Sequence, residues 1–275
     1  MANPRPVLIF DSGLGGLSVL TAIQALLPDR RIVYFADDAG FPYGERAEDD
    51  LVGRIMTLTG EAIAAYDPAA VVIACNTAST LVLPPLRERF AVPFVGTVPA
   101  IKPAVARTQT GLVAVLATPG TMKRDYTREL ISEFAAGCHV RLVGAPDLAA
   151  MAERHLAGDA VDMAALAGQI APCFVTMEGR RTDIVVLACT HYPLLTDQMK
   201  TAAPWPVTWL DPAPAIARQL ARVLGAEPMG PNAAGQDCPR PKNAAVFTGD
   251  RPVSPAIVQL LQAFNLQAET FAPAV

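Results

Sequence analysis

Short apolar runs, each followed by a polar turn and then by a helix pattern, recur along the whole chain. Residues 7–10, 112–116 and 207–210 are three such runs. A short run of this kind is typical of a buried strand, and strands that alternate with helices indicate parallel pairing. The pattern predicts an α/β fold with parallel sheets flanked by helices.

Two of these runs, residues 71–74 and 184–188, stop at a cysteine. Cys75 and Cys189 are each followed by polar side chains and then by a helix pattern. The two halves of the chain resemble weak repeats, since each has a hydroxyl-rich turn early and a strand-ending cysteine later. We therefore expect two similar domains related by pseudo-twofold symmetry, with the active site in the cleft between them. Residues 1–97 plus 210–275 would form the first domain, and residues 98–209 the second.

Composition excludes several classes of function. Of the 275 residues, 52% are hydrophobic and 17% are charged, which is enough apolar material for a large core. A net charge of −4 argues against nucleic acid as a partner, since phosphate binding needs a basic surface. The apolar runs are too short to cross a membrane, and no signal peptide is recognised. We expect a cytoplasmic protein whose five cysteines are mostly reduced.

The first strand leads into a glycine-rich turn, residues 11–16, and then into a helix pattern. Backbone N–H groups at such a helix start can hold an anion. The glycine spacing does not match a dinucleotide fingerprint, because the third position is Ser18, and no P-loop lysine follows. A carboxylate is the better-sized guest, although a tight turn without any ligand fits the pattern equally well.

Two cysteines at helix starts can act as nucleophiles or as bases, because a helix N-terminus lowers the pKa of a thiol. One activated cysteine would indicate covalent catalysis. Two cysteines on opposite faces of a small ligand indicate proton transfer that inverts a stereogenic carbon. The remaining cysteines are interpreted as structural: Cys138, Cys173 and Cys238.

Other uses of the two thiols fit less well. A redox pair lacks a Cys-x-x-Cys motif, and pyridoxal phosphate lacks a lysine in a convincing context. Zinc remains an alternative, because Cys189 and His191 could supply two ligands, but the rest lack close pairing. We expect neither a metal nor a cofactor.

The second half is predicted to contain a long alanine-rich helix from Asp159 to about Met177. The helix after Cys75 is expected to be interrupted at Pro84 and Pro85. Residues 226–242, rich in glycine, proline and asparagine, are expected to form a loop.

Four ordered motifs together resemble one family. They are residues 10–16 (FDSGLGG), 42–46 (PYGER), 74–79 (ACNTAS) and 189–195 (CTHYPLL). This combination resembles the bacterial glutamate racemases of the cofactor-independent aspartate/glutamate racemase superfamily. The resemblance implies interconversion of L- and D-glutamate, a role in peptidoglycan synthesis, and a homodimer.

The resemblance also implies roles for individual residues. Cys75 and Cys189 would be the two acid/base thiols, assisted by Asp11 and by His191, with Glu153 behind His191. Further residues would bind the substrate or orient the thiols: Asp11, Ser12, Pro42, Tyr43, Gly44, Asn76, Thr77, Thr118, Thr121, Thr190 and His191.

Two alternative functions remain open. One is a racemase for aspartate or another acidic amino acid of the same superfamily. The other is a two-lobed binding protein for a small anion, in which both cysteines are structural.

Overall fold

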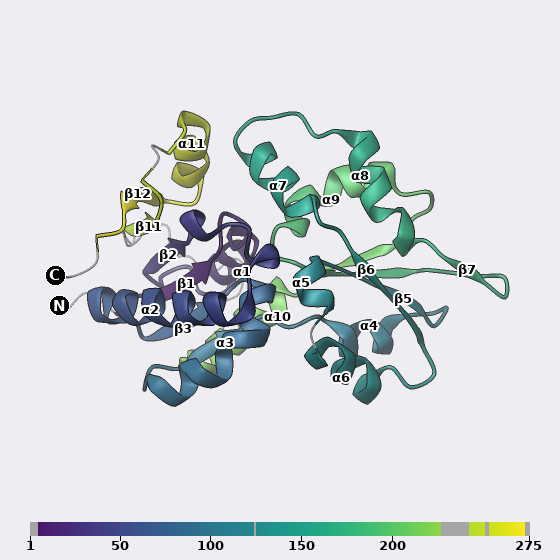
Figure 1. The fold of residues 1–275 in the computed structure, drawn as a ribbon, viewed down its shortest axis with the longest axis horizontal. Coiled ribbons are helices and arrows are strands. Elements are labelled where there is room, and N and C mark those ends of the chain that lie inside the picture. Colours follow the sequence, from purple (N-terminus) through teal and green to yellow (C-terminus); the bar gives the residue numbers. More distant parts are fainter. Residues whose placement is uncertain (1–4, 124, 227–241, 251–252, 273–275) are drawn as a thin grey trace.

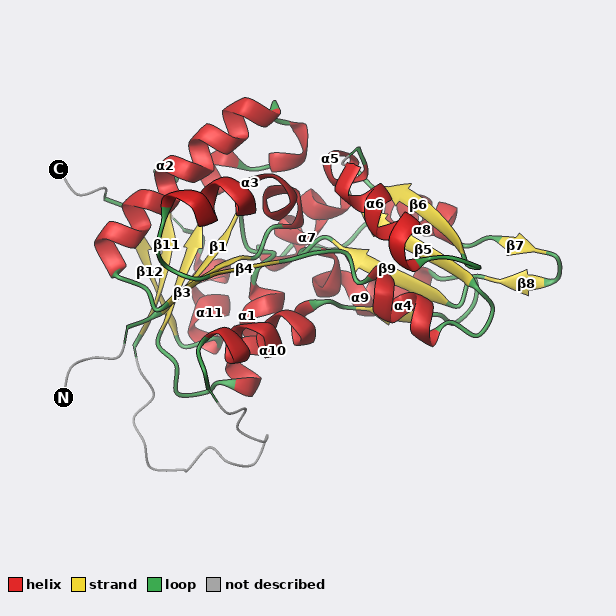
Figure 2. Cartoon of the chain, turned by 90° about the horizontal axis from the view of Figure 1, so that it is seen from below, coloured by secondary structure: helices red, strands yellow, loops and turns green. Residues whose placement is uncertain are grey.

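Strands and helices alternate along the chain and build two parallel sheets that lie side by side (Figure 1). The computed structural model describes residues 5–123, 125–226, 242–250 and 253–272. Helices cover the sheets, as Figure 2 shows in the perpendicular view. The predicted α/β class is confirmed.

The first sheet has six strands in the order β12-β11-β2-β1-β3-β4, all parallel. All five residues of β1 are buried, as expected for an inner strand covered on both faces. The strands are β1 (Val7–Asp11), β2 (Ile32–Ala36), β3 (Ala70–Ile73), β4 (Phe94–Gly96), β11 (Asn243–Phe247) and β12 (Leu266–Thr270).

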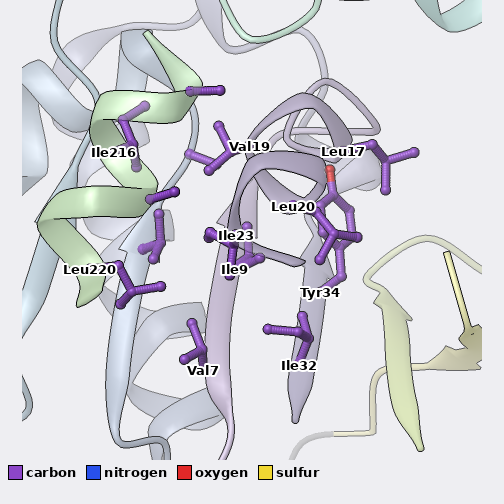
Figure 3. Close-up of a cluster of buried hydrophobic side chains, with 14 of the residues drawn as sticks. Val7, Ile9, Leu17, Val19, Leu20, Ile23, Ile32, Tyr34, Ile216 and Leu220 are labelled. Atoms are coloured by element: carbon purple, nitrogen blue, oxygen red, sulfur yellow. The ribbon is translucent and has the colours of Figure 1, made fainter. Parts of the chain in front are cut away.

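Alternate residues of the first sheet point to opposite faces, and each face carries its own core. Val7 and Ile9 of β1 pack against α1, α10 and α11, and Figure 3 shows α1 and α10 together over the sheet. Leu8 and Phe10 point the other way, into a core with α2 and α3. The helices are α1 (Leu17–Leu26), α2 (Glu48–Tyr66), α3 (Asn76–Arg89), α10 (Ala213–Val223) and α11 (Pro255–Ala263).

The second sheet has four parallel strands in the order β10-β9-β5-β6. Its strands are β5 (Leu112–Ala117), β6 (His139–Gly144), β9 (Ile184–Ala188) and β10 (Thr208–Leu210). Helices α4 and α6 pack on one face, and α7, α8 and α9 pack on the other. The helices are α4 (Ile101–Arg107), α5 (Pro119–Met122), α6 (Asp125–Phe134), α7 (Leu148–Leu156), α8 (Met163–Ile170) and α9 (Thr196–Ala202).

Four 3-10 turns and one hairpin complete the described elements. The turns are η1 (Asp38–Gly40), η2 (Tyr43–Glu45), η3 (Ala171–Cys173) and η4 (Tyr192–Leu195). The hairpin pairs β7 (Thr176–Met177) with β8 (Arg180–Arg181) in antiparallel fashion.

The two sheets share one topology. In chain order, β1, β2, β3 and β4 occupy the same places as β5, β6, β9 and β10, because the orders β2-β1-β3-β4 and β6-β5-β9-β10 match. The cysteine-bearing strands β3 and β9 are equivalent in this repeat, which agrees with the predicted pair of similar domains. The second sheet ends with Leu210 of β10, and the exact domain boundaries stay a prediction.

Two sequence-based predictions of helices are wrong. The long helix from Asp159 to Met177 is replaced by α8, η3 and the start of a hairpin. Pro172 lies in the first turn of η3, where a continuing α-helix would lose a backbone hydrogen bond. Helix α3 runs through Pro84 and Pro85, because Val82, Leu83 and Leu86 pack into one core on both sides of them.

Two further expectations concern membranes and the loop at residues 226–242. None of the described helices is long and apolar enough to cross a membrane. Most of the predicted loop, residues 227–241, lies outside the described residues, as does Cys238.

Replacing Leu20 by alanine should lower the free energy of unfolding by about 2–5 kcal/mol, because it leaves a cavity in the core between α1 and the first sheet. Denaturant unfolding followed by circular dichroism measures the change. Thr21→Ser, at an exposed position of the same helix, is the control and should change stability by less than about 0.5 kcal/mol. A loss below about 1 kcal/mol for Leu20→Ala would contradict this packing.

Candidate active site

Both cysteines lie just beyond the carboxyl ends of their strands, where parallel α/β sheets bind ligands. Cys75 is the N-cap residue of α3, and Cys189 lies between β9 and η4. Each is buried, with 7% of its surface exposed. Asp11 ends β1 and Thr118 follows β5, so residues from both sheets converge at this edge.

Hydrogen bonds connect the two halves directly across this cleft. Ser18 Oγ donates to the carbonyl oxygen of Thr190 at 2.9 Å, and the backbone N–H of Leu14 donates to Glu153 Oε1 at 2.6 Å. A weaker bond of 3.4 Å runs from Thr190 Oγ1 to Asp11 Oδ1. The cleft is therefore closed around the two cysteines.

Three threonine hydroxyls form a second bridge between the halves. Thr77 Oγ1, at the start of α3, lies 3.0 Å from Thr118 Oγ1 and 3.2 Å from Thr121 Oγ1. Thr118 and Thr121 are themselves 3.1 Å apart. Each hydroxyl can donate or accept, so the group can reorient its hydrogens toward an anion.

Cys75 has a neutral and an acidic neighbour. Ser12 Oγ lies 3.8 Å from Cys75 Sγ and can donate to it. Burial, followed by the negative charge of Asp11, raises the pKa of the Cys75 thiol to about 12. The charge of Cys189 makes a smaller contribution that raises this pKa in the same direction.

Cys189 instead has a histidine beside it. His191 Nδ1 lies 3.8 Å from Cys189 Sγ, and His191 Nε2 lies 2.7 Å from Glu153 Oε1. Burial lowers the pKa of His191, but the contacts with Cys189 and Glu153 outweigh burial and raise it well above the usual range. The His191 ring packs closely against the glycine-rich turn, since a Cβ at Gly15 would come within 2.4 Å of His191 Nδ1.

The glycine-rich turn does hold carboxylates, but they are the protein's own. The backbone N–H groups of Gly13 and Gly16 donate to Asp11 Oδ2 at 3.2 and 3.1 Å, and that of Leu14 donates to Glu153. Burial raises the pKa of Asp11, whereas His191 and the N–H of Gly16 act to lower it. The turn thus holds Asp11, whose charge acts on Cys75, and Glu153, which contacts the histidine beside Cys189.

Asn76 is the residue whose polar atoms are least satisfied in this region. Within the described part of the chain, neither its side-chain nitrogen nor its oxygen has a hydrogen-bond partner, and both are buried. Buried amides are nearly always paired, so this amide beside Cys75 is a strong candidate for binding a polar ligand.

The segment from Pro42 to Gly44 contributes backbone to the cleft. Pro42 precedes η2, and the carbonyl oxygen of Gly44 lies 3.0 Å from the place where a Cβ at Gly120 would be. Tyr43 is buried, and its hydroxyl donates to Asp37 Oδ2 at 2.5 Å. The hydroxyl of Tyr43 is therefore committed to a partner in its own half.

Some residues of the site escaped the sequence analysis. Ser18 joins the halves, and Tyr34 donates from its hydroxyl to the carbonyl oxygen of Gly13 at 2.7 Å, beneath the glycine-rich turn. Ser18 lies in a helix pattern and Tyr34 in an apolar strand, and nothing in the local sequence marks either contact. Within the described residues, no group of three or more His, Cys, Asp or Glu side chains could hold a metal ion.

Comparison with known proteins identifies the family of the chain. Residues 17–220 match the family described as Asp/Glu/Hydantoin racemase. The glutamate racemase of Brucella canis is 58% identical over 268 residues, covering 97% of this chain and 95% of that protein. The glutamate racemase of Brucella anthropi is 58% identical over 95% of this chain and 92% of its own.

Solved structures show the same likeness. Glutamate racemase of Escherichia coli, in complex with L-glutamate and the activator UDP-MurNAc-ala, has a TM-score of 0.87 at 40% identity, covering 99% of this chain and 100% of that chain. A glutamate racemase isoform of Bacillus anthracis has a TM-score of 0.77 at 25% identity, covering 98% of each chain. The chain therefore belongs to the Asp/Glu/hydantoin racemase family and is an isomerase.

Proposed function

We propose that this isomerase is a glutamate racemase that inverts Cα by proton transfer between Cys75 and Cys189, without a cofactor. The observation that carries the proposal is the placement of two buried thiols at equivalent strand ends, in one cleft, with different partners. The substrate assignment rests on the relatives named glutamate racemase and on the L-glutamate in the Escherichia coli complex.

The reaction is balanced with the two thiols alone. One thiolate takes the proton from Cα and becomes a thiol, which leaves a carbanion. The other thiol gives its proton to the opposite face of that carbon and becomes a thiolate. The product has inverted configuration, and the enzyme is set for the reverse reaction.

The surroundings of the two thiols suggest different starting states. With a pKa near 12, Cys75 is a neutral thiol at neutral pH and is ready to donate a proton. His191 carries a raised pKa and can stand beside Cys189 as an imidazolium, held in place by Glu153, where it would stabilise negative charge on that sulfur. Asp11 would receive the substrate ammonium group, which would neutralise the charge that raises the pKa of Cys75.

Neutral donors would bind the two carboxylates of glutamate. The first candidates are the Asn76 amide, which lacks a hydrogen-bond partner among the described residues, and the clustered hydroxyls of Thr77, Thr118 and Thr121. The remaining contributors are the hydroxyls of Ser12 and Thr190 and the backbone of residues 42–44. Neutral donors leave the charge balance at the thiols undisturbed, and closure of the cleft excludes water from the carbanion.

The wider setting follows from the same resemblance and is proposed with it. D-glutamate would be supplied for peptidoglycan synthesis by a cytoplasmic homodimer. The net charge of −4 agrees with a small-molecule substrate and no nucleic-acid partner.

Either Cys75→Ser or Cys189→Ser should lower kcat/KM for complete racemisation of L-glutamate by about 100-fold or more, because each variant leaves one face of Cα without its proton carrier. Circular dichroism of purified protein without added cofactor follows the reaction. Cys138→Ser, outside the cleft, is the control and should retain activity. Undiminished activity in either cleft variant would contradict the mechanism. Faster turnover of L-aspartate than of L-glutamate by the wild-type protein would contradict the substrate assignment.

Alkylation of Cys75 by iodoacetamide, followed by peptide mass spectrometry in Cys189→Ser protein, should accelerate about tenfold per pH unit from about pH 7 to about pH 10. The reason is that burial and Asp11 raise the pKa of Cys75 to about 12, so the thiolate fraction keeps rising with pH throughout this range. The Cys189→Ser substitution also removes the charge of Cys189, which raises the pKa of Cys75 less than burial and Asp11 do. A plateau below about pH 9 would show an ordinary thiol pKa instead.

A further inference from the structure

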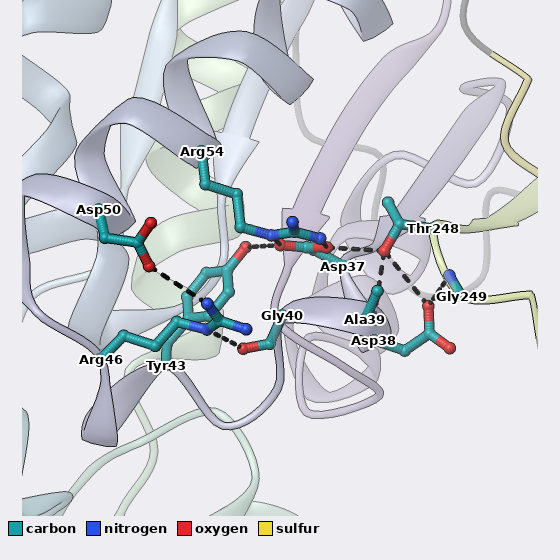
Figure 4. Close-up of polar contacts among 10 residues, drawn as sticks. All are labelled: Asp37, Asp38, Ala39, Gly40, Tyr43, Arg46, Asp50, Arg54, Thr248 and Gly249. Carbon is teal, nitrogen blue, oxygen red and sulfur yellow. Dashed lines mark hydrogen bonds and ion pairs between the residues drawn. The ribbon is translucent and has the colours of Figure 1, made fainter.

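Asp37, immediately after β2, is the centre of a polar cluster outside the thiol site, which Figure 4 shows. It is fully buried, and both carboxylate oxygens are satisfied. Oδ2 accepts from Tyr43 Oη at 2.5 Å and from Arg54 Nε at 2.6 Å. Oδ1 accepts from Arg54 Nη2 and from Thr248 Oγ1, the latter at 2.6 Å.

Asp37 and Arg54 form an ion pair at the centre of the cluster, and Tyr43 and Thr248 also donate hydrogen bonds to Asp37. Burial would raise the pKa of Asp37, but hydrogen bonds from Arg54, Thr248 and Tyr43 outweigh it and lower that pKa. The same carboxylate raises the pKa of Arg54. Replacing one member of such a pair leaves its partner uncompensated, so the geometry is strongly enforced.

Three segments that are distant in sequence meet at this carboxylate. Arg54 comes from α2, Tyr43 from η2, and Thr248 from the turn after β11. A second hydrogen bond holds the turn after β11, since the N–H of Gly249 donates to Asp38 Oδ1 at 2.7 Å. Asp37 therefore fixes η2 to the rigid sheet and helix of its own half.

The loop between Asp37 and η2 packs so closely on this contact that position 40 has no room for a side chain. A Cβ at Gly40 would lie 2.4 Å from Asp37 Oδ2 and 2.8 Å from Arg54 Nε. Arg46 Nε donates to the carbonyl oxygen of Gly40 at 2.7 Å and closes the loop from its far side.

Gly44, directly after Tyr43, touches the opposite half of the cleft. A Cβ on it would lie 3.5 Å from Thr118 Cβ, and a Cβ at Gly120 would lie 3.2 Å from the Cα of Gly44. Thr118 in turn contacts Thr77 and Thr121 through its hydroxyl. A shift of Tyr43 would therefore move backbone that borders the threonine cluster.

We propose that Asp37 is a positioning residue for substrate binding, acting through the hydroxyl of Tyr43 to hold the Tyr43–Gly44 backbone against Thr118. Asp37 itself makes no contact with the thiols, so its effect is on substrate affinity and not on proton transfer. This inference rests on the proposed racemase function for its kinetic readout. It also has a structural readout that does not depend on the substrate.

Asp37→Asn and Tyr43→Phe should each raise KM for L-glutamate about tenfold and change kcat by less than about threefold. The reason is that the positioned Tyr43–Gly44 backbone stabilises the bound substrate and the transition state equally. The double variant should be no worse than the more affected single variant, since both act through one contact. Leu20→Ala, which destabilises the opposite face of the first sheet, should leave KM unchanged. Additive losses in the double variant, or a loss confined to kcat, would overturn the proposal.

Hydrogen exchange supplies the readout that is independent of activity. Amides of residues 43–46 should exchange at least about tenfold faster in Asp37→Asn than in wild type, whereas those of β5 should not change. Unchanged exchange at residues 43–46 would overturn the positioning role. Wild-type protein that fails to racemise glutamate would instead overturn the proposed function, and the exchange result would still decide the role of Asp37.

Discussion

The contact of Glu153 with both halves of the molecule is the interaction on which the site depends. One oxygen of this carboxylate accepts from the N–H of Leu14 in the first half and lies 2.7 Å from His191 in the second. The same atom thus closes the cleft and orients the ring beside Cys189. Closure and the electrostatic setting of one thiol are therefore coupled through a single side chain.

The internal repeat explains why the thiols match in place but differ in chemistry. Strands β3 and β9 occupy equivalent positions, so Cys75 and Cys189 approach the cleft from corresponding sites in the two halves. Their neighbours are not equivalent, because Ser12 accompanies one thiol and His191 the other. An acid beside one thiol and a cation beside the other suit a pair in which one donates a proton while the other accepts it.

Sequence patterns located the elements and residues whose signals are local. Strand-ending Cys75 and Cys189 were predicted because a β-branched run and a following polar turn lie next to each other in the chain. The cluster around Asp37 escaped, because Thr248 is 211 residues away and only the folded sheet brings it near. The hairpin after η3 was missed because Glu178, with φ of 51°, takes a backbone conformation usually left to glycine or asparagine.

Racemisation in D2O, started from protiated L-glutamate and stopped early, tests the two-thiol cleft most directly. If one thiol removes the proton and the other returns one from solvent, the first D-glutamate formed carries deuterium at Cα. The recovered L-glutamate carries none at that stage. D-glutamate that retains protium, or L-glutamate that gains deuterium as fast as product forms, would show that one base serves both faces and would contradict the two-thiol mechanism.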